Sequence, residues 1–381
     1  MKKKFIIVTT VSDSLPFFKG QINVLKERFD VELVSAPGKY LDAMCNMHTV
    51  KGHEVSMKRE ISIINDFWSL LKLIVLFFKL KPFIVHGNTP KASLLSMVAA
   101  WVTRVPKRIY YVHGLRYYGE IGKKKQLLMF LEKVSCYFAT HVIAVSQGVK
   151  DGLKEDNLCK KDILLIGNGS VNGIDLSYFD PAKTDSKAVR NAHSIGENDF
   201  VFGFVGRLVG DKGVNELVGA FKQLNQIHKN IKLILIGRFE NELDPLQEET
   251  IDEIGNNKNI INAGFQKDVR PFLAAMNIFS FPSYREGFGI VLMEASAMNI
   301  PSISSNILGC NEVIFKDVNG FLIESKNQQV LLDKMGYCIQ NPEKINEMAK
   351  LSREIVKDKF EQKELWQKSL KVYVGIADNS N

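Results

Sequence analysis

Short apolar runs that alternate with longer helical patterns recur along the chain, and this alternation constrains its fold more than any other feature. Such runs are typical of strands buried on both faces of a parallel sheet. Strands that alternate with helices favour an α/β fold, with helices covering both sides of the sheet. The predicted strands are 5–10, 31–35, 82–86, 108–113, 141–145, 163–166, 200–205, 231–236, 259–262, 277–281 and 301–305.

The length of 381 residues exceeds the usual size of a single core, so we expect two domains. We predict two Rossmann-like, doubly wound domains that face a central cleft. The first covers residues 1–180 and the second 181–360, with the polar segment 181–197 as the linker. Residues 361–381 are predicted to form a C-terminal helix and tail that pack back on the first domain.

The charge is distributed unevenly between the two parts of the chain. Residues 1–150 contain 23 Lys and Arg against 10 Asp and Glu, whereas residues 151–381 contain 27 against 32. A basic first part suggests an anionic partner, and nucleic acid, acidic lipid and a phosphorylated substrate all fit. The five cysteines form no Cys-x-x-Cys, and the start of the sequence does not resemble a signal peptide. We therefore expect a reducing, cytoplasmic setting and no structural zinc.

The segment Phe67–Leu80 is the most apolar part of the sequence, and Lys72 and Lys79 interrupt it. Because a membrane span needs about 20 residues with few charges, we predict a helix packed within its domain rather than one lying on lipid. Basic, aromatic and aliphatic residues are mixed between Arg116 and Phe130. That mixture fits a membrane-surface patch, and it equally fits a solvated helix face.

The stretch Phe279–Met298 combines a short strand, a loop containing Gly287 and Gly289, and a helix that begins near Gly289. The helix is apolar on nearly every face, so it must be buried. Glu294 lies within it, and a carboxylate is rarely buried without hydrogen-bond donors or a polar cleft. A strand, a glycine-containing loop and a helix N-terminus also suit an anion. The pattern predicts a site, although an ordinary strand–helix unit shares it.

Other candidate residues follow the carboxyl ends of predicted strands, where open parallel sheets bind their ligands. His113 ends a strand of the first domain, and Arg207 and Lys212 follow the first strand of the second. Two cations and a helix N-terminus suit a diphosphate, and Glu294 suits the hydroxyls of a ribose. We therefore expect a nucleotide-diphosphate pocket in the cleft. A lone histidine such as His113 can equally be structural.

Motifs for other ligands are absent from the sequence. Gly-x-Gly-x-x-Gly does not follow the first strand, so a dinucleotide cofactor has no support. Asp-x-Asp does not occur, and the cysteines and histidines form no plausible metal cage. We expect no metal and no cofactor. No nucleic-acid recognition motif accompanies the basic part, so nucleic acid is not an expected partner.

Together these residues resemble glycosyltransferase family 4, whose members are retaining enzymes of the GT-B architecture. The resemblance covers nearly the whole chain, and no single motif would establish it alone. Its motifs are Glu286-x7-Glu294 after Pro282-Ser-Tyr-Arg, Gly206-Arg207-Leu208, Lys212-Gly213, Asn172-Gly-Ile-Asp175 and Gly309-Cys-Asn-Glu312.

The resemblance implies a role for each candidate residue. Arg207 and Lys212 would neutralise the diphosphate of the donor as it leaves. Glu294 would bind the ribose, and Glu286 would lie near the hydroxyls of the donor sugar. His113 would contact that sugar close to the reacting carbon. Retention is usually described as a substitution on one face of the sugar, which needs no side-chain nucleophile and depends on electrostatic stabilisation.

Further contacts with the donor follow from the same resemblance. The loop of Gly287, Phe288 and Gly289 would meet phosphate through its amides, and Gly264 and Phe265 would lie near the base. The first-domain loop of the family often has paired glycines near the diphosphate, whereas this chain has only Gly20. Asn299 stands where the family usually has glycine after the helix, and asparagine tolerates the left-handed conformation that this turn needs.

The sequences His113–Arg116 and Gly309–Glu312 also resemble bacterial enzymes that extend polyprenyl-diphosphate-linked sugars for surface polysaccharides such as capsules. The implied donor is a nucleoside-diphosphate sugar, with UDP as the nucleotide, and the transferred group is a hexose or an N-acetylhexosamine. The implied acceptor is a sugar, free or lipid-linked. Peripheral contact with the cytoplasmic face of the inner membrane would accompany a lipid-linked acceptor.

Two alternatives remain open from the sequence. A UDP-sugar 2-epimerase has the same fold, but the Glu286-x7-Glu294 spacing favours a transferase. A non-catalytic protein that binds an anionic surface would account for the basic first part and for little else.

Overall fold

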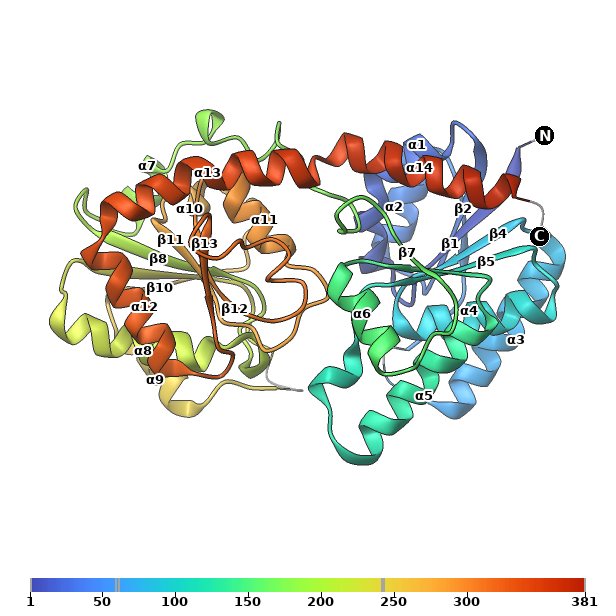
Figure 1. The fold of residues 1–381 in the computed structure, drawn as a ribbon, viewed down its shortest axis with the longest axis horizontal. Helices are drawn as coiled ribbons and strands as arrows, with labels where there is room; N and C mark the ends of the chain where they lie inside the picture. Colours follow the sequence, from blue (N-terminus) through green and yellow to red (C-terminus); the bar gives the residue numbers. More distant parts are fainter. Residues whose placement is uncertain (1, 59, 61, 241–243, 380–381) are drawn as a thin grey trace. The chain divides into compact units, whose positions relative to one another are not determined.

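The computed structural model describes residues 2–58, 60, 62–240 and 244–379 and contains two compact units (Figure 1). Unit 1 comprises Met1–Gly173 and Gln362–Asn381, and unit 2 comprises Ile174–Glu361. The chain therefore crosses between the units twice. The two crossing segments lie side by side, because the amide of Ile174 donates to the carbonyl of Phe360 at 2.9 Å.

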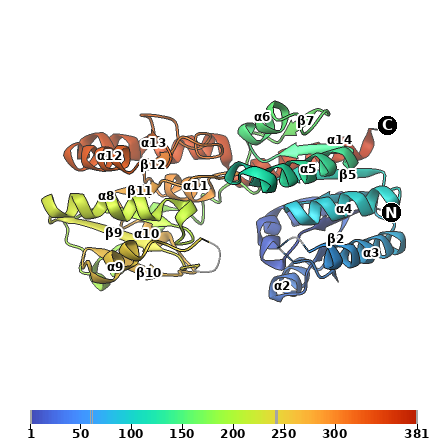
Figure 2. The ribbon, with the colours of Figure 1, turned by 90° about the horizontal axis from the view of Figure 1, so that it is seen from below.

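Each unit is a twisted parallel sheet with helices packed on it, which confirms the predicted fold class (Figures 1 and 2). The sheet of unit 1 has the order β3-β2-β1-β4-β5-β6-β7 in the described part of the chain. Its strands are β1 (Lys3–Val8), β2 (Phe29–Ser35), β3 (Lys51–Glu54), β4 (Ile84–Gly87), β5 (Lys107–Val112), β6 (His141–Ala144) and β7 (Ile163–Leu165).

The helices of unit 1, except for the last one, lie between successive strands, as parallel pairing requires. They are η1 (Ser12–Phe18), α1 (Lys19–Leu25), α2 (Lys39–His48), α3 (Ile63–Leu80), α4 (Pro90–Val102), η2 (Arg116–Gly119), α5 (Gly122–Phe138), α6 (Gln147–Glu155) and the C-terminal α14 (Gln362–Asp378). Ser146 caps α6, since its hydroxyl accepts a hydrogen bond from the Val149 amide at 3.1 Å.

Unit 2 repeats this arrangement with the order β10-β9-β8-β11-β12-β13 over its described residues. Its strands are β8 (Phe200–Val205), β9 (Ile231–Ile236), β10 (Ile260–Gly264), β11 (Ile278–Phe281), β12 (Ser302–Ser305) and β13 (Gly320–Ile323). Its helices are η3 (Pro181–Lys183), α7 (Lys187–Ala192), η4 (Gly210–Lys212), α8 (Val214–Ile227), α9 (Glu248–Asn256), α10 (Arg270–Leu273), α11 (Ile290–Ala297), α12 (Gln328–Gln340) and α13 (Pro342–Phe360).

Both sheets change winding direction at one point, between β1 and β4 in unit 1 and between β8 and β11 in unit 2. From that point, successive strands are added outward on either side. The loops that leave the two central strands diverge to opposite faces, and the crevice at their carboxyl ends is where such sheets bind ligands. The topology therefore marks one edge of each sheet as the place to examine for chemistry.

The polar segment 181–197, predicted to be the linker, instead belongs to unit 2. It forms η3 and α7. The guanidinium of Arg190 holds this segment against unit 2, because it donates to the carbonyls of Ala275 at 3.0 Å and Gly196 at 2.7 Å. The segment is polar because it covers the surface of unit 2, whereas the chain actually changes unit after Gly173.

The C-terminal helix α14 packs on unit 1 beside α1 (Figure 1). Tyr373 of α14 is fully buried, and the ammonium group of Lys3 donates to the carbonyl of Ala377 at 2.8 Å. Glu361 separates α13 from α14. Asn341 precedes α13, and its side chain donates to the Tyr337 carbonyl at 2.8 Å and does not cap α13.

Helix α3 contains the most apolar segment of the sequence, and it is only partly packed within unit 1. Ser69, Leu73 and Phe77 form its buried stripe. Its exposed large apolar side chains are Ile63, Ile64, Phe67, Trp68, Val75 and Phe78. The prediction of a packed helix is therefore correct for one face only. No helix in the described ranges is long and apolar enough to cross a membrane.

Gly20 of α1 packs against Trp366 of α14. A Cβ atom at Gly20 would lie 1.7 Å from the Trp366 ring of α14. The missing side chain thus makes room for an indole. This packing gives the glycine a structural reason, and the predicted contact between Gly20 and a donor diphosphate stays a prediction.

We predict that Gly20→Ala destabilises unit 1 by about 1–3 kcal/mol, because overpacking forces side chains and backbone to shift. The free energy of unfolding in urea measures the effect. In a Trp366→Ala background, the same Gly20→Ala change should be nearly neutral. An equal loss in both backgrounds would show that the indole is not what limits residue 20.

Candidate functional site

The winding switch of unit 2 brings together two loops that lie far apart in the sequence. Lys212, in the loop after β8, forms an ion pair with Glu286, in the loop after β11. The Ser283 hydroxyl lies 3.2 Å from the same Glu286 oxygen, and the Lys212 nitrogen lies 5.6 Å from the centroid of the Phe281 ring. Both charged side chains are largely buried, so the ammonium and the carboxylate are held in fixed positions.

A glycine permits this approach of the two loops. Gly213 has φ of 70°, a left-handed conformation that favours glycine. A Cβ atom there would lie 2.2 Å from the Pro282 carbonyl oxygen. The Lys212-Gly213 pair is therefore one structural unit, in which the glycine lets the lysine reach Glu286.

Asp211 is a second anchor of these loops, and the sequence reasoning missed it. One of its oxygens accepts hydrogen bonds from Arg285 at 2.8 and 3.1 Å, and the other lies 3.8 Å from the Arg207 guanidinium. Arg207 is exposed and also donates to Glu240 at 2.8 Å. Asp211 and Arg285 each adjoin a predicted site residue in sequence, which is the only signal that could have pointed to them.

The loop of Gly287, Phe288 and Gly289 is held against the segment that follows β12. Gly309 has φ of 77°, and a Cβ atom there would lie 2.7 Å from the Gly287 carbonyl group. The amide of Gly289 donates to the Gly309 carbonyl at 3.0 Å. Because the Gly289 amide is already used, the predicted phosphate contact of this loop rests on the Phe288 amide.

Glu294 lies on α11, the helix predicted to begin near Gly289, and it is half-buried. Burial raises the pKa of its carboxyl group to about 7. Within the described residues it has no hydrogen-bond or ion-pair partner. A largely desolvated carboxylate without donors is what a ligand that supplies hydroxyl donors would stabilise. The turn after this helix contains Asn299 with φ of 61°, as predicted.

Gly264 and Phe265 lie at the end of β10, on the other side of β9 from the loops described above. Gly264 has φ of 63°, and its carbonyl accepts from the Gly237 amide at 2.9 Å. Phe265 is exposed, with the Arg238 guanidinium 4.3 Å from its ring centroid. An exposed ring stacked with a cation is a flat surface suited to another aromatic group. Arg238 is a further candidate that the sequence reasoning missed.

His113 follows the end of β5 in unit 1 and belongs to a buried hydrogen-bond chain. Its Nε2 lies 3.1 Å from the side-chain oxygen of Asn88, and the amide nitrogen of Asn88 lies 3.0 Å from Nδ1 of His86. Nε2 of His86 lies 3.0 Å from the hydroxyl of Tyr373 on α14. Asn88 follows β4 at the winding switch, and β4 pairs with β5, the strand that precedes His113.

These hydrogen bonds show which nitrogen of the His113 imidazole carries the proton. The Asn88 oxygen can only accept, so His113 donates from Nε2 and carries its lone pair on Nδ1. Burial lowers the pKa of His113 to about 4 and that of His86 to about 3, so both are neutral near pH 7. His113 is therefore oriented by Asn88, which the sequence reasoning did not identify. The sequence signal that could have identified Asn88 is its position, as a polar residue directly after the strand next to that of His113.

The predicted site residues thus fall into two groups, one in each unit. Lys212, Glu286 and the exposed Arg207 meet at the switch of unit 2, with Glu294 on the helix that follows. His113 and Gly20 belong to unit 1. The described residues include no cluster of three or more histidine, cysteine, aspartate or glutamate side chains that could hold a metal ion.

We predict that Glu294→Gln alters the pH dependence of stability. The pKa of Glu294 is raised in the folded state above its ordinary value of 4.5. Folding of the wild type therefore loses stability as the pH rises through 4.5 toward 7, whereas the glutamine variant does not. The difference in melting temperature should be near zero at pH 4 and should grow in favour of Glu294→Gln up to pH 8. A constant difference over this range would contradict the raised pKa.

We predict that Asn88→Asp raises the pKa of His113 by about 1–3 units, because an adjacent carboxylate favours the imidazolium. Asn88→Ala, which adds no charge, should leave that pKa low. NMR titration of the histidine Cε1 protons, assigned with a His113→Gln variant, measures both. If the pKa of His86 rose instead, the Asn88 amide would have the opposite orientation, with its oxygen toward His86 and its nitrogen toward His113.

Comparisons with known proteins identify the family of this chain. Residues 22–171 match the family described as Glycosyltransferase Family 4, and residues 185–355 match Glycosyl transferases group 1. The chain is 36% identical over 373 residues to the capsular polysaccharide biosynthesis glycosyltransferase CapM of Staphylococcus aureus, covering 97% of each chain. It is 29% identical over 306 residues to a UDP-Gal:alpha-D-GlcNAc-diphosphoundecaprenol alpha-1,3-galactosyltransferase of Escherichia coli, covering 78% of this chain and 77% of the other.

The fold also has close counterparts among solved structures. Anabaena HepE in complex with UDP-glucose superposes with a TM-score of 0.80 at 20% identity, covering 98% of this chain and 99% of that one. This likeness identifies the GT-B architecture. The two family matches and the near full-length similarity to CapM show that the chain belongs to glycosyltransferase family 4.

Proposed function

We propose that this protein is a retaining glycosyltransferase that moves a hexose or N-acetylhexosamine from a UDP-sugar to a polyprenyl-diphosphate-linked sugar, without a metal ion. The observation that carries the proposal is the Lys212–Glu286 ion pair at the winding switch of unit 2, with Arg207 beside it. Family membership supports the transferase chemistry. The donor and acceptor classes follow the names of related enzymes.

On the donor side, two cations would offset the charge of the diphosphate. Lys212 is a buried point charge held by Glu286, whereas Arg207 is exposed and can form paired hydrogen bonds with phosphate oxygens. Glu294 would accept from the ribose hydroxyls, and such donors would lower its raised pKa. Phe265 and Arg238 would bind the flat face of the base.

In the transfer step, the bond between the anomeric carbon and the phosphate oxygen breaks, and the acceptor oxygen bonds to that carbon on the same face. The proton of the acceptor hydroxyl passes to the departing phosphate oxygen. The protein stabilises the negative charge that develops on the diphosphate through Arg207 and Lys212. No side-chain nucleophile enters this scheme.

His113 would serve the sugar as a neutral hydrogen-bonding group. Its Nε2 proton is used by Asn88, so Nδ1 is an acceptor for a sugar hydroxyl. A low pKa keeps it neutral at physiological pH and avoids placing a positive charge beside a carbon that becomes cationic. Asn88 would fix the orientation of the ring.

The acceptor assignment follows the relatives. The Escherichia coli relative is named for transfer to a sugar on diphosphoundecaprenol, and CapM is named for capsular polysaccharide biosynthesis. An anionic lipid carrier also suits the basic first part of this chain. A cytoplasmic location with peripheral membrane contact belongs to the same proposal.

We predict that Arg207→Ala lowers kcat/KM for sugar transfer by about 10²–10³, because it removes one cation that stabilises the leaving diphosphate. Mass spectrometry of products from UDP- and GDP-sugars, with a polyprenyl-diphosphate-sugar acceptor, measures transfer and identifies the donor. Lys222→Ala is a matched control, since Lys222 forms a surface ion pair with Glu253 at 3.2 Å in the same unit. Transfer by Arg207→Ala at nearly the wild-type rate would contradict the assignment of Arg207 to the site. Formation of a product from UDP-sugar without an acceptor would indicate an epimerase.

A further inference from the structure

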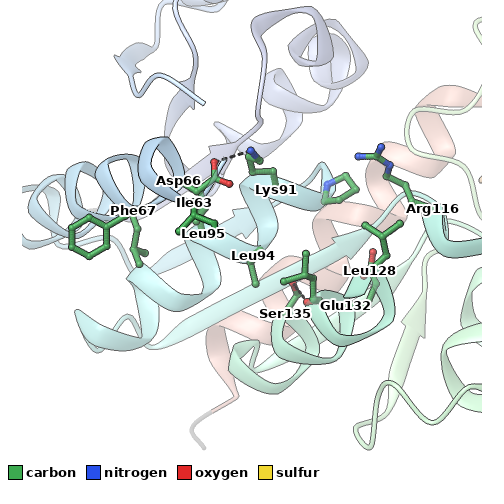
Figure 3. A pocket seen from close by; sticks show the side chains of 13 residues that line it. Ile63, Asp66, Phe67, Lys91, Leu94, Leu95, Arg116, Leu128, Glu132 and Ser135 are labelled. Atoms are coloured by element: carbon green, nitrogen blue, oxygen red, sulfur yellow. Dashed lines mark hydrogen bonds and ion pairs between the residues drawn. The ribbon is translucent and has the colours of Figure 1, made fainter. Parts of the chain in front are cut away.

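Unit 1 contains an apolar cavity of about 270 Å³ between α3, α4 and α5 (Figure 3). Leucines form much of its wall, namely Leu70, Leu94, Leu95, Leu128 and Leu131. The two basic residues of the lining, Lys91 and Arg116, lie in the upper part of Figure 3, and this end of the cavity is called the basic rim. The cavity is thus apolar inside and basic at one end, which is the pattern of a site for an amphiphile with an anionic head.

The charges at that rim are unequal. Lys91 is neutralised by Asp66, whose carboxylate lies 2.7 Å from its ammonium group. Arg116 has no hydrogen-bond or ion-pair partner within the described ranges. Deeper in the cavity, Glu132 accepts a hydrogen bond from Tyr110, and burial raises its pKa to about 7. The positive charge of Arg116 acts against burial and lowers the pKa of Glu132. The rim therefore has one cation without an ion-pair partner in the described ranges, and the buried acid Glu132 lies within reach of its charge.

More positive charge lies at the N-terminus of α5, where it does not stabilise the helix. Lys123, Lys124 and Lys125 occupy the first turn of α5, which has no acidic residue. The N-terminus of a helix is itself positive, so lysines there are unfavourable. Among the residues that the structure describes, Glu120 pairs with Lys124 at 2.7 Å and no carboxylate pairs with the other two lysines. This arrangement favours an external anion as the partner.

Large apolar side chains lie exposed to solvent beside the cavity, where they add nothing to the core of the domain. Ile63 and Phe67 of α3 line it and are exposed, and Ile64 and Trp68 extend the apolar surface along the same helix. Burying such a side chain would be favourable, because it removes apolar surface from water. A contiguous patch of this kind usually marks a binding surface. Small-molecule sites typically enclose about 300–1,000 Å³, so this cavity holds only part of a long chain and the patch can take the rest.

The position of Arg116 connects the cavity to the proposed reaction. It opens η2, three residues after His113, at the carboxyl edge of the sheet where ligands bind. We propose that this cavity binds the isoprenoid chain of the lipid-linked acceptor, with the diphosphate on Arg116 and the lysines of α5, so that its sugar lies at the His113 edge of the sheet. The proposal rests on the transferase function proposed above and specifies where its acceptor is held.

The binding test uses farnesyl diphosphate, inorganic diphosphate and farnesol, each titrated by calorimetry below its aggregation concentration. We expect farnesyl diphosphate to bind at least about tenfold more tightly than either partial ligand, because only it has both chain and charge. Leu128→Asn and Arg116→Gln should each weaken its binding at least about tenfold. Farnesol or inorganic diphosphate binding as tightly as farnesyl diphosphate would overturn the proposal.

Matched controls separate the cavity from the general surface. Leu127 neighbours Leu128 on α5 but is exposed and does not line the cavity, and Lys133 is an exposed cation of the same helix. Leu127→Asn and Lys133→Gln should change affinity less than about twofold. If Leu127→Asn weakened binding as much as Leu128→Asn, the apolar surface would be a bilayer contact and the cavity proposal would fail.

A second readout distinguishes this proposal from the transferase proposal itself. UDP should raise the melting temperature equally in the wild type and in Leu128→Asn, which also shows that the variant folds. In transfer assays, Leu128→Asn should raise KM for the polyprenyl acceptor and leave KM for the UDP-sugar unchanged. A rise in the donor KM alone would contradict the cavity assignment. If UDP did not raise the melting temperature of the wild type, the result would count against the transferase function instead.

Discussion

The strand order of the second sheet is the constraint on which the candidate donor site depends. Parallel pairing in the order β10-β9-β8-β11-β12-β13 places β8 beside β11, although more than seventy residues separate them. Their following loops leave the same edge and meet there, joined by the Lys212–Glu286 ion pair. A buried pair of this kind is a weak source of stability, because desolvation offsets attraction. Its consequence is geometric, since it holds an ammonium and a carboxylate at a defined place in a crevice.

Glycines with left-handed backbones make that meeting possible. Gly213 lets the β8 loop approach the Pro282 carbonyl, and Gly309 brings the segment after β12 against Gly287. In both cases a Cβ atom would collide with backbone, which cannot move aside like a side chain. The glycines therefore act on the site by allowing close packing of loops. Ligand contact is not needed to explain them.

In unit 1, polar and apolar groups are arranged in ways that folding alone does not explain. The buried chain from Tyr373 through His86 and Asn88 fixes the tautomer of His113. Nearby, α3 leaves large apolar side chains exposed beside a basic cavity rim. In the proposed reaction, the first feature would orient a neutral acceptor for a sugar hydroxyl, and the second would suit an amphiphilic carrier. Both follow from the proposed reaction, and they can be tested separately.

The sequence by itself determined the α/β class, the positions of most strands, and the loop and helix around Glu286 and Glu294. Local patterns suffice for these features, because a buried strand, a glycine turn and a helix start each depend on neighbouring residues. It misplaced the linker at 181–197, since polarity marks surface as readily as a domain boundary. Tertiary structure alone decided what Gly20 packs against, how Asn88 orients His113, and that Asp211 joins Arg207 to Arg285. It also decided that the Gly289 amide is occupied and that leucines of three helices enclose a cavity. These contacts join residues far apart in the chain, and only the packing of whole elements brings them within hydrogen-bonding or van der Waals distance.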